Sequence, residues 1–124
     1  MADVTPSIPE GRQVIETYGE GRFRISGEIW QGSVIVMPER TVEWRPTAWA
    51  EVDLDSFGGL LEWQGAEVLL VGCGQRMEMV SGSLRRNLRA AGMVVETMDT
   101  GAACRTYNIL LAEDRRVAAA LIAV

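Results

Sequence analysis

Apolar residues in the second half of the chain follow two alternating patterns. The runs EVLLVG (67–72), MVVETM (93–98) and VAAALIAV (117–124) predict strands, and the first and last are apolar at nearly every position, as in strands covered on both faces. Between these runs, segments 81–92 and 99–113 space their apolar residues at helical intervals. This order predicts an α/β domain in which helices cover a layered sheet.

The helix predicted at 81–92 has two distinct faces. Leu84, Leu88 and Ala91 recur at i, i+4 and i+7, whereas the arginines at 85, 86 and 89 lie away from that stripe. Ser81 is a suitable N-cap and Gly92 is a suitable helix end.

The first half of the chain predicts short strands. QVIETYG (13–19), RFRIS (22–26), SVIVMP (33–38) and TVEW (41–44) are rich in β-branched or aromatic residues, and several are bounded by glycines. We expect the first two to form a hairpin through residues 19–21.

Two other segments of the first half have different patterns. Segment 53–63 (DLDSFGGLLEW) begins with capping candidates and spaces apolar residues at helical intervals, although Gly58 and Gly59 weaken a helix there. Residues 1–12 contain two prolines and few apolar residues, which predicts a loosely held arm. A single domain is then expected over residues 13–124.

The segment MDTGAACRTYN (98–108) gathers five kinds of polar group on one predicted helix. If Asp99 or Thr100 caps a helix that runs to about residue 113, Arg105 and Asn108 lie on its outer side, free to meet solvent, a ligand or another protein. The inner face is formed by Ala103, Tyr107, Leu110 and Leu111, with Cys104 at its edge.

Three of these polar groups also have an ordinary structural explanation. Asp99 is either a helix cap or a carboxylate base, and Cys104 is either a small buried hydrophobe or a thiol activated near a helix start. Arg105 is either a solvated surface residue or a contact for an anion or a partner.

Composition and charge exclude several kinds of function. The chain has 124 residues, 48% of them hydrophobic, and a net charge of −5, which disfavours binding to nucleic acid or to anionic lipid. All twelve basic residues are arginines, so Schiff-base chemistry and the Walker lysine are excluded. There is no histidine, which excludes Ser-His-Asp relays and the usual zinc sites. We therefore expect no catalytic residues, no metal and no cofactor, and the sequence leans away from an enzyme.

The two cysteines and the apolar runs bear on location. Cys73 and Cys104 form no C-x-x-C pair, and the first thirty residues contain no signal segment, which favours the cytoplasm. No apolar run approaches the roughly 20 residues of a membrane-spanning helix, so a soluble protein without membrane insertion is expected.

The loop VGCGQRMEM (71–79) leaves a predicted buried strand and enters a helix, where open α/β sheets tend to bind ligands. Gly72, Cys73, Gly74 and Arg76 are the candidate binding residues, because backbone N–H groups there could hold an anion. The dinucleotide fingerprint fails at Met77, however, and a tight strand-to-helix turn is the simpler explanation.

Four tryptophans are many for a chain of this size. Trp49 lies in the loop EWRPTAW (43–49) and is the candidate for a partner contact, because tryptophan is enriched at binding hot spots. Packing in the core or at its rim is the alternative.

Several stretches together resemble a known family. FRISG, GSVIVMP, the Gly-x-Gly turn after LLVG and VETMDTGAACRTYNILLAEDRRVAAALI are similar to the Mth-type domain family, over about residues 13–122. This family is of uncharacterised function and includes a mitochondrial complex I assembly factor and an adipogenesis-associated protein. The resemblance implies a three-layer α/β fold whose central, mostly parallel mixed sheet has helices on one side and additional β structure on the other.

The resemblance also implies that protein binding is a capability of the family, and no shared enzymatic activity can be carried over. The positions that match its motif include Asp99, Cys104, Arg105 and Asn108. Relatives often carry threonine where this chain has Cys73, so a shared ligand geometry at that turn does not follow.

Two functional hypotheses remain. The first is a non-enzymatic interaction or assembly factor with an unidentified protein partner. The second is a small-molecule or anion site at the Gly72 to Ser81 turn, near Asp99 and Arg105. The sequence leaves a homodimer open.

Overall fold

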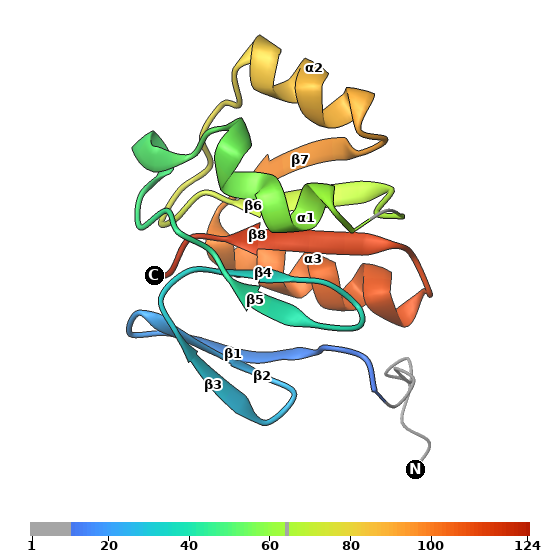
Figure 1. The fold of residues 1–124 in the computed structure, drawn as a ribbon. Helices are drawn as coiled ribbons and strands as arrows, with labels where there is room; N and C mark the ends of the chain where they lie inside the picture. Colours follow the sequence, from blue (N-terminus) through green and yellow to red (C-terminus); the bar gives the residue numbers. More distant parts are fainter. Residues whose placement is uncertain (1–10, 64) are drawn as a thin grey trace.

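The computed structural model describes residues 11–63 and 65–124, so nearly all of the expected N-terminal arm lies outside the described residues. Arg12, the last residue of that arm, forms ion pairs with Glu39 at 3.3 Å and Asp114 at 3.7 Å. The described chain folds into a five-stranded sheet, a separate three-stranded sheet and the helices that cover them (Figure 1).

The larger sheet is mixed and has the strand order β5-β4-β8-β6-β7. Its strands are β4 (Val34–Val36), β5 (Thr41–Glu43), β6 (Val68–Gly72), β7 (Val94–Met98) and β8 (Val117–Leu121). The last three are parallel to one another, whereas β4 is antiparallel to both β5 and β8. The three strands predicted in the second half of the chain are confirmed, and all five residues of β8 are buried, as its apolar run requires.

The smaller sheet is an antiparallel meander of β1 (Ile15–Gly19), β2 (Arg22–Ile25) and β3 (Glu28–Gln31). The hairpin predicted through residues 19–21 is confirmed. The strand β3 has no counterpart among the predicted strands. It is only four residues long, has Trp30 half-buried and its other residues exposed, and pairs on one side only. The tight turn before it places Ser26 and Gly27 at φ 47° and 85°, which lets β2 reverse directly into β3.

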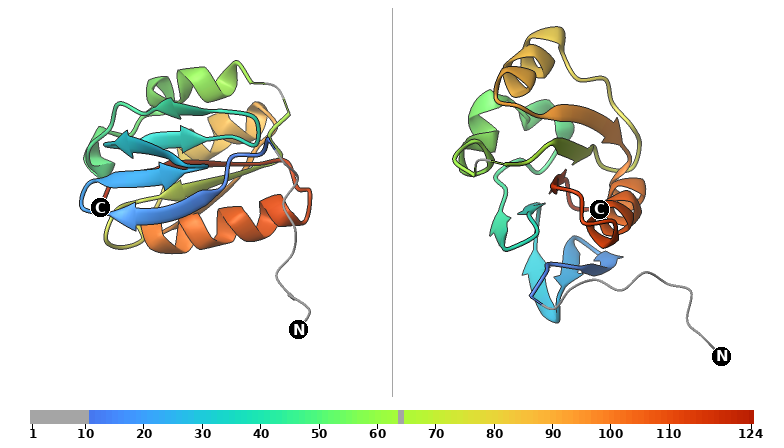
Figure 2. Two further views of the ribbon diagram at one scale, coloured as in Figure 1. Left: turned by 90° about the horizontal axis from the view of Figure 1, so that it is seen from below. Right: turned by 90° about the vertical axis from the view of Figure 1, so that its right-hand side faces the viewer.

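Helices cover both faces of the larger sheet. One face packs on α3 (Thr100–Ala112) and on the small sheet, through a core that includes Phe23, Leu70 and Tyr107. The opposite face packs on α2 (Gly82–Ala90), on α1 (Gly58–Leu61) and on two 3-10 turns, η1 (Trp49–Glu51) and η2 (Leu54–Phe57). Figure 2 shows the small sheet beside α3, with α2 at the other side of the molecule.

The three-layer α/β class expected from the resemblance is confirmed, but the layers differ in one respect. Helices were expected on one side and the additional β structure on the other, whereas the small sheet shares its side with α3. The reason lies in the period-two alternation of β6: Leu69 and Val71 point to one apolar core and Leu70 to the other, so both faces need cover.

The local helix signals act as predicted. The Ser81 hydroxyl accepts a hydrogen bond from the Leu84 N–H at 3.2 Å, and Gly92 ends that segment at φ 94°. In the helix predicted at 53–63, the Asp53 side chain caps the start by accepting a hydrogen bond from the Ser56 N–H at 2.9 Å. That helix begins as the 3-10 turn η2 and continues as one α turn, because Gly58 and Gly59 give it little intrinsic stability.

Candidate functional site

A cleft lies where the carboxyl ends of β6 and β8 reach the edge of the larger sheet. It has a volume of about 290 Å³ and is lined by residues 47–49, 73–76, 78 and 122–124. Four of the predicted site residues, Trp49, Cys73, Gly74 and Arg76, therefore line one cleft. Its place agrees with the rule that open α/β sheets bind ligands beyond the carboxyl ends of their strands.

The loop that forms one wall of this cleft is held by Thr100, which is fully buried. The Thr100 hydroxyl accepts from the Gly74 N–H at 3.0 Å and donates to the Ile122 carbonyl at 2.8 Å, and the Thr100 N–H donates to the Gly74 carbonyl at 2.9 Å. One side chain thus joins the β6 loop, the start of α3 and the end of β8. The local sequence predicts Thr100 only as a helix cap, since partners 22 and 26 residues away leave no local signal.

Both glycines of the turn serve its geometry. A Cβ at Gly72 would come within 2.9 Å of the Thr100 Cα and 3.0 Å of Leu121, so only glycine lets β6 pack this closely on α3. Gly74 has φ 108°, which a residue with a side chain adopts only with strain. The tight-turn explanation accounts for both residues.

The backbone of this turn is already engaged. The Cys73 N–H donates to the Met98 carbonyl at 2.9 Å, and the Gly74 N–H donates to Thr100. These two donors are therefore not available to an anion. Folding uses these two N–H groups of the predicted anion site to fix the loop.

The two cysteines lie on opposite faces of the larger sheet. Cys73 belongs to the core under α2, Cys104 belongs to the core under α3, and both are free thiols. Burial raises the pKa of the Cys73 thiol, and burial raises the pKa of Cys104 to about 12. Neither environment activates a nucleophile, and the sheet keeps the two sulfur atoms from pairing.

Thiol reactivity tests this assignment. At about pH 8 a thiol with a pKa of about 12 has a thiolate fraction on the order of a thousandfold below that of free cysteine, so Cys104 is expected to react with Ellman's reagent only after unfolding. Cys73, which borders the cleft, should react slowly. Fast stoichiometric labelling of the native protein at Cys104, checked with Cys73→Ser, would contradict the burial described above.

Neither Asp99 nor Arg105 is among the residues that line the cleft. Asp99 is the N-cap of α3 and accepts from the Ala102 N–H at 2.9 Å, which favours its structural explanation. Arg105 is exposed and donates from Nη1 to the Tyr18 hydroxyl at 2.9 Å, bridging α3 and β1. Gly101 makes room for this pair, because a Cβ there would lie 2.6 Å from the Tyr18 hydroxyl oxygen.

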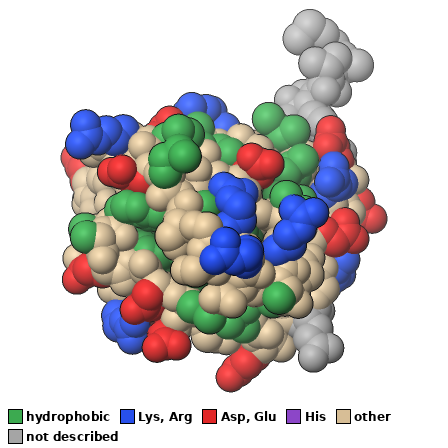
Figure 3. All heavy atoms as spheres, turned by 90° about the horizontal axis from the view of Figure 1, so that it is seen from above, with side chains coloured by type: hydrophobic (Ala, Val, Ile, Leu, Met, Phe, Trp, Pro, Cys, Tyr) green, Lys and Arg blue, Asp and Glu red, His purple; other side chains and the backbone are tan. Residues whose placement is uncertain are grey.

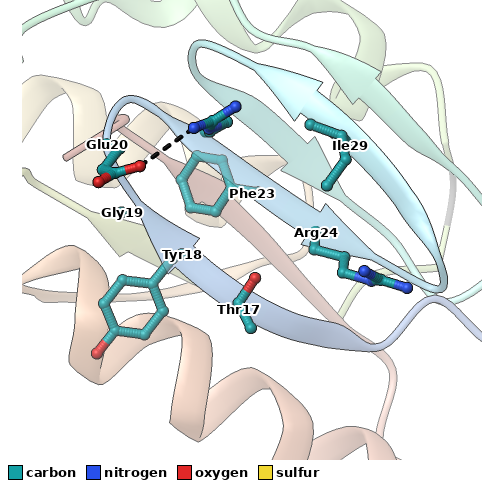
Figure 4. A pocket seen from close by; sticks show the side chains of 8 residues that line it. Thr17, Tyr18, Gly19, Glu20, Phe23, Arg24 and Ile29 are labelled. Carbon is teal, nitrogen blue, oxygen red and sulfur yellow. Dashed lines mark hydrogen bonds and ion pairs between the residues drawn. The ribbon is translucent and has the colours of Figure 1, made fainter.

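A shallow hollow of about 420 Å³ lies on the small sheet beside this pair. Figure 4 shows Thr17, Arg24 and Ile29 around it, and Tyr18 turned toward α3. Glu20 and Arg22 form an ion pair at 3.1 Å at its rim. Ile29 is 53% exposed and Tyr18 is 41% exposed, so this face offers two exposed apolar side chains among charged ones.

Asn108 differs from its prediction. It was expected to face solvent or a partner, yet its Nδ2 donates to the Ile15 carbonyl at 2.7 Å and its Oδ1 accepts from the Ile15 N–H at 3.0 Å. The small sheet covers this side of α3, so the amide binds the β1 backbone. Because β1 lies 93 residues earlier in the chain, helix periodicity alone could not identify this contact.

The loop that borders the cleft also exposes two methionines. Met77 is 56% exposed and Met79 is 81% exposed, and both follow Arg76 in the chain. Trp49 is half-buried and packs against the core as well as lining the cleft.

Over the described ranges, no three His, Cys, Asp or Glu residues are grouped so that they could hold a metal ion. None of the helices described has the length and apolar content needed to cross a membrane.

Comparisons with known proteins identify relatives over most of the chain. Residues 15–122 match a family described as "Protein of unknown function (DUF498/DUF598)". A curated relative from Xenopus tropicalis, NADH dehydrogenase (ubiquinone) 1 alpha subcomplex assembly factor 3, is 35% identical over 109 residues, which cover 87% of this chain and 60% of the relative. The chain thus spans less than two thirds of that protein.

Solved structures agree on the fold. A Bordetella pertussis protein described as a Mth938-like domain has a TM-score of 0.81 and 29% identity, covering 97% of this chain and 91% of that one. A protein from Bartonella henselae, described as an outer membrane protein, has a TM-score of 0.84 and 39% identity, covering 95% of this chain and 99% of that one. The names of these similar proteins differ, but their fold is the same.

Proposed function

The chain belongs to the DUF498/DUF598 family, in agreement with the Mth-type resemblance of its sequence, and on this basis we propose that it is a non-enzymatic assembly factor that binds other protein chains. The observation that carries the proposal is the 35% identity, over 87% of the chain, to a protein named as an assembly factor of NADH dehydrogenase. The same relative makes a subunit of the cell's own NADH dehydrogenase the first client to test.

The cleft supplies side chains suited to a protein contact. Tryptophan, arginine and methionine are enriched in the buried centres of protein interfaces, and Trp49, Arg76 and Met77 lie in the cleft or in the loop that borders it. The small-ligand alternative has less support, because the Cys73 and Gly74 N–H groups are bonded within the fold. We place the protein in the cytoplasm, where thiols such as its two free cysteines stay reduced.

Complementation in the parent cell tests the proposal. Deletion of the gene is expected to lower the amount of assembled NADH dehydrogenase on native gels, and the wild-type chain should restore it. Arg76→Glu and Trp49→Ala are expected to restore it only in part, since an interface anchor typically contributes 2 kcal/mol or more, roughly a thirtyfold loss in affinity.

Arg115→Glu is the matched control for Arg76→Glu, because it makes the same charge change at an exposed position outside the cleft. Arg105→Glu tests separately whether the outer side of α3 also contacts the client. Normal assembly of NADH dehydrogenase in the deletion strain would overturn the proposed client. Equal rescue by Arg76→Glu, Trp49→Ala and the control would remove the cleft from the contact surface.

A further inference from the structure

The outer face of α2 carries three arginines. Leu84 and Leu88 are buried against the larger sheet, whereas Arg85, Arg86 and Arg89 are all exposed. At 3.6 residues per turn these three positions fall within one arc on the side away from the leucines. α2 therefore packs on the sheet with one face and presents guanidinium groups with the other.

This positive face is not neutralised locally. α2 itself contains no acidic residue, and within residues 11–63 and 65–124 none of its three arginines forms an ion pair, unlike Arg12, Arg22, Arg24 and Arg45. Figure 3, which views the molecule from the α2 side, shows arginine side chains gathered together, with hydrophobic and acidic side chains around them. Such a concentration of positive charge is unusual on a chain whose net charge is −5.

The three arginines do not have the same role in the fold. Arg85 donates from Nη1 to the Val95 carbonyl at 3.0 Å, which covers part of the free edge of β7 and gives Arg85 a structural function. Arg86 extends over the start of α2, where a Cβ on Gly82 would lie 3.1 Å from its Nη1. Arg86 and Arg89 form no hydrogen bond through their side chains in the described part of the chain, so their planar donor sets can bind carboxylates.

The surroundings favour a protein over other polyanions. Met77 and Met79 are exposed in the loop that leads into α2, and methionine adapts to the apolar side chains of a partner. No aromatic residue occurs in segment 75–90, so the face lacks the stacking platforms of single-strand nucleic-acid binders. A helix of nine residues is only about 14 Å long, and the acidic remainder of the molecule would repel a phosphate backbone or an anionic bilayer that extends beyond it.

We infer that Arg86 and Arg89 of α2, together with the exposed Met77 and Met79, bind an acidic segment of a protein partner in which carboxylates alternate with bulky apolar side chains. This inference deepens the proposed function, because it states the chemistry of the partner segment. The surface adjoins the cleft, because Met77 follows Arg76 in the chain, but its two arginines are different from the residues Trp49 and Arg76 that the complementation experiment changes.

A binding titration on the whole chain tests it. The probe is a fluorescent peptide built of glutamate and leucine at helical spacing, beside the same peptide with lysine for glutamate. The wild-type chain is expected to bind the acidic peptide, more weakly as salt is added, and not the basic one. The double variant Arg86→Glu/Arg89→Glu should bind it about tenfold more weakly, since two attractive contacts become repulsive.

Arg40→Glu/Arg115→Glu is the control, because it makes the same change in net charge at exposed positions away from α2. This control should stay within about twofold of wild type, because charges beyond a Debye length are screened. An equal loss of affinity in both double variants would overturn the inference, because it would indicate a general effect of net charge. Undiminished binding by Arg86→Glu/Arg89→Glu would also overturn it, because the two arginines would then make no contact with the peptide. Unfolding curves show whether each variant is folded. If Arg86→Glu/Arg89→Glu does not fold, the single variant Arg89→Ala is compared with Arg115→Ala instead.

Single-stranded DNA and vesicles containing phosphatidylglycerol are titrated in parallel. Tighter binding to either than to the acidic peptide would overturn the assignment of a protein partner. The outcomes also separate the two proposals. If the chain does not bind the acidic peptide but the deletion strain assembles less NADH dehydrogenase, only the α2 surface is rejected. If the chain binds the peptide but the deletion strain assembles NADH dehydrogenase normally, only the proposed client is rejected.

Discussion

Replacing Thr100 by valine is expected to lower the free energy of unfolding by about 3 kcal/mol, which for a chain of this size corresponds to a fall in Tm of about 10 °C. Valine keeps the shape of threonine but removes its hydroxyl. The Gly74 N–H and the Ile122 carbonyl would then lose their bonds of 3.0 and 2.8 Å in a fully buried site. Leaving a buried donor or acceptor without a partner costs about 1–3 kcal/mol each.

Thr100→Ser separates the contribution of the hydroxyl group to stability from that of the methyl group. Serine retains both hydrogen bonds and loses one buried methyl group, so it should cost only about 1 kcal/mol. Denaturant unfolding measures both variants, and hydrogen exchange at the Gly74 amide should accelerate in the valine variant first. A valine variant as stable as the serine variant would mean that the two backbone groups find other partners.

Thr100 also explains how the cleft keeps its shape. The loop after β6 has three separate ties, through Cys73 to β7 and through Gly74 to both the hydroxyl and the N–H of Thr100. Gly72 packs directly on the Thr100 Cα, so the strand end cannot move away from α3 without opening a void. The loop that carries Arg76 therefore begins at a rigid edge, which lowers the entropy lost when a partner binds there.

Local patterns were sufficient to predict most of the elements. The continuous apolar runs predicted β6, β7 and β8, and the leucine spacing with Ser81 and Gly92 predicted α2 with both of its ends. These signals act over a few residues, and tertiary contacts reinforce them here. The short β3 lacked such a signal, because Ile29 and Trp30 are adjacent apolar residues without alternation.

Roles that depend on distant partners could not be predicted in this way. Helix periodicity predicts that Arg105 and Asn108 lie together on the outer side of α3. It could not show that the small sheet packs on this side, because Tyr18 and Ile15 lie 87 and 93 residues earlier. Likewise, the separation of Cys73 and Cys104 follows from which face of the sheet each one meets.

Asn108→Leu is expected to lower the free energy of unfolding by about 2 kcal/mol. The Asn108 amide both donates to and accepts from the Ile15 backbone, at 2.7 and 3.0 Å, and leucine would leave these two half-buried groups without their partners. The small sheet meets α3 mainly along β1, and just before this strand the Tyr107 hydroxyl donates to the Gln13 carbonyl at 2.9 Å. Loss of the Asn108 bonds should therefore loosen β1 before it affects the larger sheet.

Asn87→Leu provides the matched control, because Asn87 is an exposed helix residue on α2 and the same substitution there should change stability by about 0.5 kcal/mol or less. Denaturant unfolding gives the two free energies, and hydrogen exchange shows where protection is lost. In Asn108→Leu, the amides of β1 and β2 should exchange faster while those of β6 and β8 keep the protection of the global fold. Equal effects of the two substitutions would mean that the Asn108 amide contributes nothing beyond its neighbours. Uniform loss of protection would mean that the two sheets unfold as one cooperative unit.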